Sequence, residues 1–295
     1  MVYYICAVQF QIIYFYIMRE KCIDAHQHFW LYDPARHTWM NDDMTALKTD
    51  FSPLDLLPHL QNAALDGCIA VQADQSENEN AFLLSLSEKH DFIEGIVGWV
   101  DLCAANVEDR LRYYHQFHKV KGFRHVLHDE VQRDFMLRPD FLKGVSQLKN
   151  YNFTYDILIF TDQLAYTLDF IKVLPEQRFV IDHIAKPLIK EQIVGEWKDY
   201  MIQIASFKNV YCKISGLVTE ADWLGWRKED FKTYLDSVVE AFGTDRIMYG
   251  SDWPVCQLAA TYEEQWSIVK DYFSNFSKTE QEQFFGGNAI RFYSL

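Results

Sequence analysis

Short runs of apolar and β-branched residues recur along the chain and predict buried β-strands. Between these runs, apolar residues return every three or four positions, which is the spacing of amphipathic helices. The clearest helical patterns cover residues 80–90, 107–120, 163–174 and 232–243. The expected strands cover residues 21–28, 67–74, 93–102, 120–127, 152–160, 178–187, 209–218 and 245–254. Strands that alternate with helices in this way predict an α/β protein with a parallel sheet.

Polar residues gather at the carboxyl end of nearly every expected strand. Examples are His28, Gln72, Arg124, His183 and Asp252. Catalytic groups occupy this end of the strands in a closed barrel. An open doubly wound sheet has the same strand pattern, but it does not make its first and last strands neighbours. We therefore predict a (β/α)8 TIM barrel, in which Asp252 can approach the histidines of the first strand.

The first strand carries three ionisable groups in the stretch IDAHQHFW, residues 23–30. Side chains alternate along a strand, so Asp24, His26 and His28 are expected on one face, opposite Ile23, Ala25 and Gln27. Two imidazoles on one face suit metal binding or polarisation of a bound carbonyl. The alternative is that each histidine only satisfies a local hydrogen bond.

Composition and charge favour a small-molecule partner. The formal net charge of -14 at pH 7, with no Lys/Arg run, argues against nucleic acid and anionic membrane surfaces as partners. Hydrophobic residues make up 49% of the chain, which is ample for a large core. The six cysteines form no C-x-x-C pair, as expected for a reduced, cytoplasmic chain. The sequence leaves the oligomeric state open, including a homodimer.

Residues 1–17 are uncharged and almost all apolar, and they form an uncertain extension. This stretch is at the short limit for crossing a bilayer and lacks both a basic segment and a cleavage site. Three interpretations stay open: an over-extended reading frame before Met18, a short hydrophobic anchor, or an extra strand or dimer contact. No membrane partner is expected unless residues 1–17 are genuine. Residues 18–295 are expected to form a single barrel domain, with the long first crossover, residues 31–53, as a lid or pocket wall.

The ordered motifs at the strand ends resemble the amidohydrolase superfamily. The stretches IDAHQHFW, VQADQ, GWVDL, GFRHVL, TYDILI, DHIAKP, CKISGLV and GSDWPV together are similar to a sugar-lactonase group of the amidohydrolase-2 type, typified by L-fuconolactonase. The resemblance covers residues 22–295. It implies a hydrolase of carbohydrate metabolism, active in L-fucose catabolism, that opens an aldonolactone to its aldonic acid.

Opening a lactone requires a base for water, donors for the oxyanion and an acid for the leaving alkoxide. We predict Asp252 as the base, with space beside it at Gly250; the alternative is a capping aspartate. The imidazoles expected around the carbonyl are those of His26, His28 and His183, with a core hydrogen bond as the alternative for His183.

Substrate-binding residues are predicted from the remaining strand ends. Arg124 is a forked donor suited to the carbonyl, with an ion pair to Asp156 as its alternative or additional role. His125 has the opposite parity and is expected to face the helices. Groups that could bind sugar hydroxyls or stack on the ring are Asp156, Gln72, Lys213 and Trp30, with packing as the alternative role for Trp30, Trp99 and Trp253.

The strand-four lysine and strand-five histidine of the superfamily pattern are missing here. A two-metal centre is therefore not expected, and we predict that no cofactor is required. The alternative is one divalent metal, Zn²⁺, held by His26, His28 and Asp252 with help from His183 or water. Two further functions stay open, a metal-dependent decarboxylase or other amidohydrolase acting on a small carboxylate, and a non-catalytic carbohydrate-binding barrel.

Overall fold

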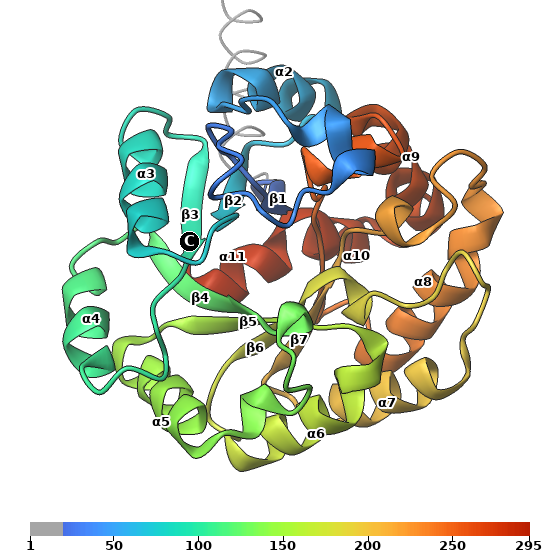
Figure 1. Cartoon of the computed structure of the whole chain (residues 1–295). Helices are drawn as coiled ribbons and strands as arrows, with labels where there is room; N and C mark the ends of the chain where they lie inside the picture. The colour runs from blue at the N-terminus through green and yellow to red at the C-terminus, as the bar shows by residue number, and fades with distance from the viewer. Residues whose placement is uncertain (1–19) are drawn as a thin grey trace, which may run out of the picture.

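Eight parallel strands hydrogen-bond in chain order, from β1 to β8, in a computed structural model that describes residues 20–295 (Figure 1). Each strand lies inside one of the runs expected from the sequence. The strands are β1 (Ile23–Gln27), β2 (Gly67–Val71), β3 (Ile93–Gly98), β4 (Val120–Val126), β5 (Thr154–Leu158), β6 (Phe179–Ile181), β7 (Val210–Ile214) and β8 (Ile247–Tyr249).

The last strand segment returns to the first and closes the barrel. Gln27 and Trp253 form a parallel bridge. The backbone N–H of His28 donates to the carbonyl of Trp253 at 2.7 Å, and that of Asp252 donates to the carbonyl of His26 at 2.8 Å. The (β/α)8 barrel predicted from the sequence is confirmed, and closure brings Asp252 beside the histidines of β1.

Helices surround the strands on the outside (Figure 1). Local sequence explains where some of them begin: Ser52 and Asp55 form a capping box around Pro53, the first helical residue, and Thr261 and Glu264 form another. The helices are α2 (Pro53–Ala63), α3 (Glu77–Ser87), α4 (Val107–Tyr114), α5 (Pro139–Leu148), α6 (Leu164–Val173), α7 (Gly195–Ala205), α8 (Lys228–Phe242), α9 (Tyr262–Phe273), α10 (Lys278–Glu282) and α11 (Asn288–Tyr293). No helix within residues 20–295 has the length and apolar character needed to cross a membrane. The interpretations of residues 1–17 fall outside the described residues.

The predicted alternation of faces in β1 is wrong. Ile23 and Ala25 pack with the apolar side chains inside the barrel. Asp24 instead points outward, where it accepts hydrogen bonds from the Tyr262 hydroxyl at 3.1 Å and from the Ser251 backbone at 2.9 Å. The physical reason is a bulge, because the pairing of β1 with β2 shifts register between Asp24 and Gln27. His26 and His28 still converge, but Asp24 does not join them.

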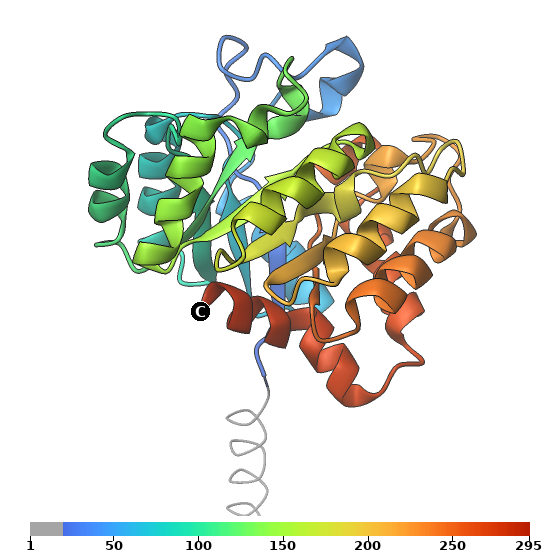
Figure 2. The same ribbon diagram turned by 90° about the horizontal axis from the view of Figure 1, so that it is seen from below.

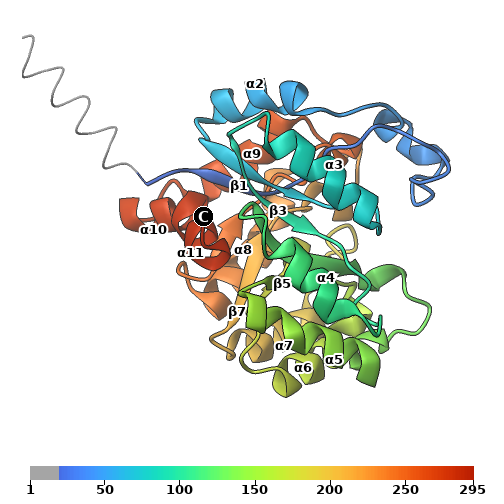
Figure 3. The ribbon, with the colours of Figure 1, turned by 90° about the vertical axis from the view of Figure 1, so that its left-hand side faces the viewer.

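The two ends of the barrel are covered by different segments. The first crossover, residues 31–53, lies at one end, and α11 lies at the opposite end (Figures 2 and 3). Within that crossover, a 3₁₀ helix, Asp42–Leu47, packs against the 3₁₀ helix Val255–Leu258 that follows β8. At the other end, Tyr293 of α11 is fully buried and donates its hydroxyl to Asp156 Oδ2 at 2.8 Å. Because α11 fills the opposite end, the accessible cavity lies at the carboxyl ends of the strands, with the first crossover as part of its wall.

Candidate active site

A cavity of about 520 Å³ opens at the carboxyl ends of the strands. Its walls come from loops after β1, β2, β4, β5, β6, β7 and β8 and from the first crossover. Polar lining residues include His28, Gln72, Arg124, His183, Lys186, Glu220 and Asp252. Aromatic lining residues include Trp30, Trp39, Phe160 and Trp223. A cavity with convergent polar groups at this end of a barrel is the expected position of an active site.

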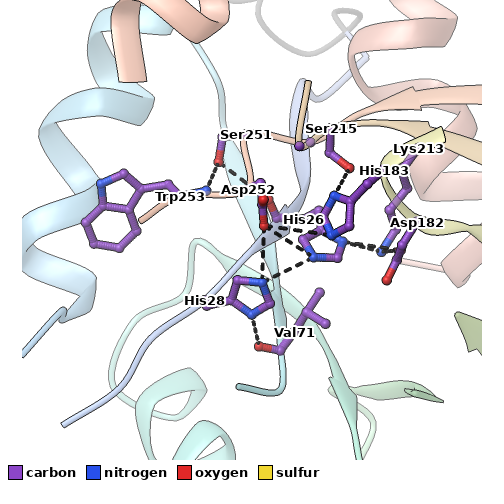
Figure 4. Close-up of polar contacts among 12 residues, drawn as sticks. His26, His28, Val71, Asp182, His183, Lys213, Ser215, Ser251, Asp252 and Trp253 are labelled. Carbon is purple, nitrogen blue, oxygen red and sulfur yellow. Dashed lines mark hydrogen bonds and ion pairs between the residues drawn. The ribbon is translucent and has the colours of Figure 1, made fainter. Parts of the chain in front are cut away.

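His26 of β1 and His28, which directly follows that strand, lie beside the carboxylate of Asp252 (Figure 4). Asp252 Oδ1 lies 3.8 Å from His26 Nε2 and 3.4 Å from His28 Nε2. His28 Nδ1 lies 2.8 Å from the carbonyl oxygen of Val71, which can only accept, so this nitrogen carries the proton. The other ring nitrogen, Nε2, faces Asp252.

Asp252 is buried and ionised at neutral pH. Its φ of 57° lies in the left-handed region, which aspartate tolerates better than most residues and which turns the side chain into the cavity. Burial by itself would raise the pKa of Asp252, but His183 and the hydrogen bond with His28 outweigh burial and lower it below its ordinary value. Gly250 gives space to His26 and not to a ligand, because a Cβ there would lie 2.6 Å from His26 Cβ.

His183 is the third histidine beside Asp252 and the first residue of a strained turn. Its Nε2 lies 3.9 Å from Asp252 Oδ1, and its Nδ1 lies 2.9 Å from Ser215 Oγ. From His183 to Lys186, four consecutive non-glycine residues have φ between 46° and 61°. Such residues cost roughly 1–2 kcal/mol each and cluster at functional sites. Burial lowers the pKa of His183 to about 3, so this imidazole is neutral at physiological pH.

Arg124 is held beside the histidines by a partner that the sequence interpretation missed. Its Nη1 donates to Asp182 Oδ2 at 3.1 Å and lies 3.3 Å from His26 Nε2. The expected ion pair with Asp156 is wrong, because the guanidinium reaches across to β6. Arg124 lines the cavity, and its buried Nε has no hydrogen-bond partner among the described residues.

Asp156 and Lys213 lie beneath the cavity and do not line it. Both side chains are fully buried, and Lys213 Nζ contacts Asp156 Oδ2 at 2.6 Å and Asp182 Oδ1 at 3.1 Å. Lys213 Nζ also lies 3.1 Å from His26 Nδ1. The predicted contact of Asp156 and Lys213 with sugar hydroxyls is therefore not available in this structure, because the histidines lie between this pair and the cavity.

The other predicted residues divide between cavity and core. Gln72 and Trp30 line the cavity, and the Trp30 indole donates to the carbonyl of Thr49 at 2.9 Å. Trp253 is packed against Phe29 and Phe51 and does not line the cavity. Trp99, whose backbone is held by Asn80, does not line it either. His125 faces the helices as predicted, stacked on Phe135 at 5.1 Å.

The sequence interpretation gave no role to several polar residues of the site, among them Asp182, His128 and Glu220. Asp182 follows β6 directly, so its place at a strand end was an available signal. Lys213, His26 and Arg124 overcome the effect of burial and lower the pKa of Asp182 well below its ordinary value. His128 and Glu220 also line the cavity. These two lie on short 3₁₀ turns, where no periodic pattern marks them.

The donor atoms at the base of the cavity fit a divalent metal ion. One donor atom each from His26, His183 and Asp252 lies within 4.8 Å of the others. His28 Nε2 lies 3.2 Å from His26 Nε2, so it could serve as a fourth donor atom and a third imidazole nitrogen. Burial lowers the pKa of His26 well below its ordinary value, which keeps this ring neutral, as a metal ligand must be. Imidazole and carboxylate are suitable ligands for Zn²⁺.

The chain belongs to the amidohydrolase family, whose model matches residues 23–295. It is 39% identical over 284 residues to L-fucono-1,5-lactonase of Burkholderia multivorans, covering 92% of this chain and 96% of that protein. It is 31% identical over 281 residues to L-fucono-1,5-lactonase of Burkholderia ambifaria, covering 92% of this chain and 95% of that protein. A crystal structure of an amidohydrolase from Burkholderia multivorans with bound Zn has a TM-score of 0.90 and 40% identity, covering 93% of this chain and 99% of that chain.

Proposed function

We propose that this chain hydrolyses a sugar lactone, L-fuconolactone or a close relative, to the aldonic acid. The observation that carries the proposal is the ionised Asp252 among three imidazoles at the base of a sugar-sized cavity. Two relatives that share 31% and 39% identity over nearly the whole chain are L-fucono-1,5-lactonases, which supports this substrate class. The decarboxylase and the non-catalytic barrel are not favoured, because both of these relatives are lactonases by name.

Asp252 acts as the general base in the proposed reaction. It accepts a proton from water while the water oxygen attacks the lactone carbonyl carbon. His28 and His183, which line the cavity, hold the water and the carbonyl in place, and the fully buried His26 lies against the carboxylate. Arg124 donates to the carbonyl oxygen, which becomes the tetrahedral oxyanion, and its buried Nε is suited to this because no protein group uses it.

Collapse of the tetrahedral intermediate breaks the ring C–O bond. The proton that Asp252 took from water passes to the leaving alkoxide, so the carboxylate is regenerated and the product is a hydroxy acid. At neutral pH the new carboxylic acid ionises and releases one proton per turnover. The reaction is thereby balanced without an external oxidant or reductant.

The proposed hydrolysis does not require a metal ion. Arg124 already places a permanent positive charge 3.3 Å from His26 Nε2, where the carbonyl oxygen needs a donor. Where a metal is bound, His26, His183 and Asp252 would hold it, and it would polarise the carbonyl and lower the pKa of water. These same side chains carry out binding and proton transfer in either case.

A lactone screen tests the proposal. Purified protein is incubated with fucono-, galactono-, arabinono- and rhamnonolactones, and acid release is followed with a pH indicator, with the uncatalysed rate subtracted. We expect the fastest release from L-fuconolactone or a close stereochemical relative. No release above the uncatalysed rate from any lactone would overturn the proposal.

The same assay addresses the metal question. Protein treated with a chelator and freed of metal, as verified by elemental analysis, is expected to retain its rate. A rate that disappears with the metal and returns with Zn²⁺ would overturn the metal-free proposal alone.

We also propose that the protein works in the cytoplasm and in L-fucose catabolism. The names of the two relatives support the pathway, and the cysteines support the compartment. Four described cysteines, Cys68, Cys103, Cys212 and Cys256, are free thiols, as expected in a reducing compartment. A homodimer stays a prediction, which light scattering of the purified chain would test.

A further inference from the structure

An ion pair lies in the cavity wall, apart from the proposed base Asp252. Lys186 Nζ contacts Glu220 Oε1 at 2.6 Å, and the two side chains are 15% and 19% exposed. Both residues line the cavity. We propose that the Lys186–Glu220 pair binds ring hydroxyls of the lactone and sets the choice among lactones. This inference rests on the proposed function.

The chemistry of the pair matches a sugar hydroxyl. A hydroxyl both donates and accepts, so it can accept from the Lys186 ammonium while a neighbouring hydroxyl donates to the Glu220 carboxylate. Within residues 20–295, Lys186 Nζ donates one hydrogen bond, to Glu220. An ammonium has three donors, so two remain for a ligand. Hydrogen bonds to charged groups are stronger than neutral ones, which makes such a pair discriminating.

The strained turn after β6 aims Lys186 at the cavity. Lys186 has a φ of 47° and is the last of the four left-handed residues that begin at His183. The turn therefore presents two groups to one cavity, the imidazole of His183 beside Asp252 and the ammonium of Lys186 in the wall. An ion pair that only linked two loops would not require a strained, left-handed backbone at both His183 and Lys186, the two ends of this turn.

The pair is separate from the reacting atoms. No hydrogen bond or ion pair joins Lys186 or Glu220 to Asp252 in the part of the chain that the structure describes. Lys186 Nζ also lies 5.8 Å from the ring centroid of Phe160, another residue that lines the cavity. Loss of the pair should therefore weaken substrate binding more than the chemical step.

The test compares Lys186→Met and Glu220→Gln with a matched surface pair. Each variant is expected to raise KM for L-fuconolactone about 10- to 100-fold and to change kcat by less than about threefold, as for loss of a charge-assisted hydrogen bond. The control is Lys198→Met, which breaks the Lys198–Glu240 pair at 2.8 Å on the outer helices and should leave KM unchanged.

A second readout separates hydroxyl binding from a structural role. Lactones that lack one ring hydroxyl each are compared with the parent lactone. In the wild type, a lactone without the hydroxyl that the pair binds should have a lower kcat/KM than the parent lactone. In Lys186→Met, the ratio of these two kcat/KM values should approach one. If Lys186→Met does not fold, the isosteric Glu220→Gln decides the outcome by the same ratio.

The outcomes are distinguishable. A wild type that hydrolyses no lactone overturns the proposed function. A wild type that hydrolyses lactones, with variants whose KM and hydroxyl discrimination are normal, overturns the role of the pair alone. Variants that lose kcat and melting temperature while keeping the hydroxyl penalty also overturn it, since they would show a structural clamp.

Discussion

At the scale of single residues, the site is defined by charge states that burial imposes. Burial lowers the pKa of His183 to about 3 and that of His26 well below its ordinary value, so both rings are neutral. Asp252 stays ionised because its pKa is lowered despite burial. Asp252 is therefore in the unprotonated form at neutral pH, which a general base must be in to accept a proton from water.

Replacement of Asp252 by asparagine should abolish the base and keep the shape. We expect kcat to fall by roughly 10² to 10⁴, which is the usual contribution of a positioned base. The rate is measured by acid release on L-fuconolactone, and folding is checked by the melting temperature and near-UV circular dichroism. Asp199→Asn, on the exposed surface of α7, serves as the control and should keep the wild-type rate. A folded Asp252→Asn variant with a near-normal rate would remove Asp252 from the role of base.

At the scale of elements, two irregular backbones assemble the site. The bulge in β1 sends Asp24 outward and keeps His26 and His28 inside. The turn after β6 shortens that strand to Phe179–Ile181, although the apolar run suggested a strand to residue 187. Gly216, with a φ of 62°, lies against this turn, and a Cβ there would be 2.7 Å from His183 Nδ1.

Gly216→Ala should therefore displace His183 and strain the backbone. We expect a loss of roughly 1–2 kcal/mol in the free energy of unfolding, from the positive φ, and a fall in kcat of at least about tenfold. Unfolding in denaturant and lactonase rates measure the two effects.

Gly243→Ala separates these effects, because its φ is 70° but its Cβ would meet only the side chain of Asp245. This variant should lose at least as much stability, because its ψ of 172° with this φ is a conformation essentially confined to glycine, and it should keep its activity. Equal activity in the two variants would mean that the position of His183 does not matter.

At the scale of the whole molecule, buried charges connect the floor of the barrel to the site. The chain of contacts runs from Tyr293 to Asp156 at 2.8 Å, to Lys213 at 2.6 Å, and on to Asp182 at 3.1 Å. Burial raises the pKa of Asp156 to about 6, against the effect of Lys213 and the hydrogen bond from Tyr293, which both lower it. The C-terminal helix thus stabilises a charge that lies directly beneath His26.

Tyr293→Phe tests this connection through the pH dependence of stability. A carboxyl with a raised pKa in the folded state contributes stability below its unfolded pKa, and this contribution is lost as pH rises through about 6. Without the hydroxyl the pKa should rise further, so the loss in the free energy of unfolding should be larger at pH 7.5 than at pH 5. We expect about 1–2 kcal/mol at the higher pH, measured by denaturant unfolding. An equal loss at both pH values would contradict the role of Tyr293.

The sequence alone was enough to predict where the strands lie, that they close into a barrel, and that Asp252 lies near His26 and His28. These features are predictable because periodicity and strand-end polarity are local signals. It also predicted that Arg124, Gln72 and Trp30 would be near the site, and all three line the cavity. Three other features became known from the folded structure. Arg124 pairs with Asp182, Asp24 points outward, and Lys213 and Asp156 lie below the cavity. The physical reason is that a bulge, a left-handed turn and partners on non-adjacent strands depend on how the closed barrel packs, and no regular spacing along the chain records them.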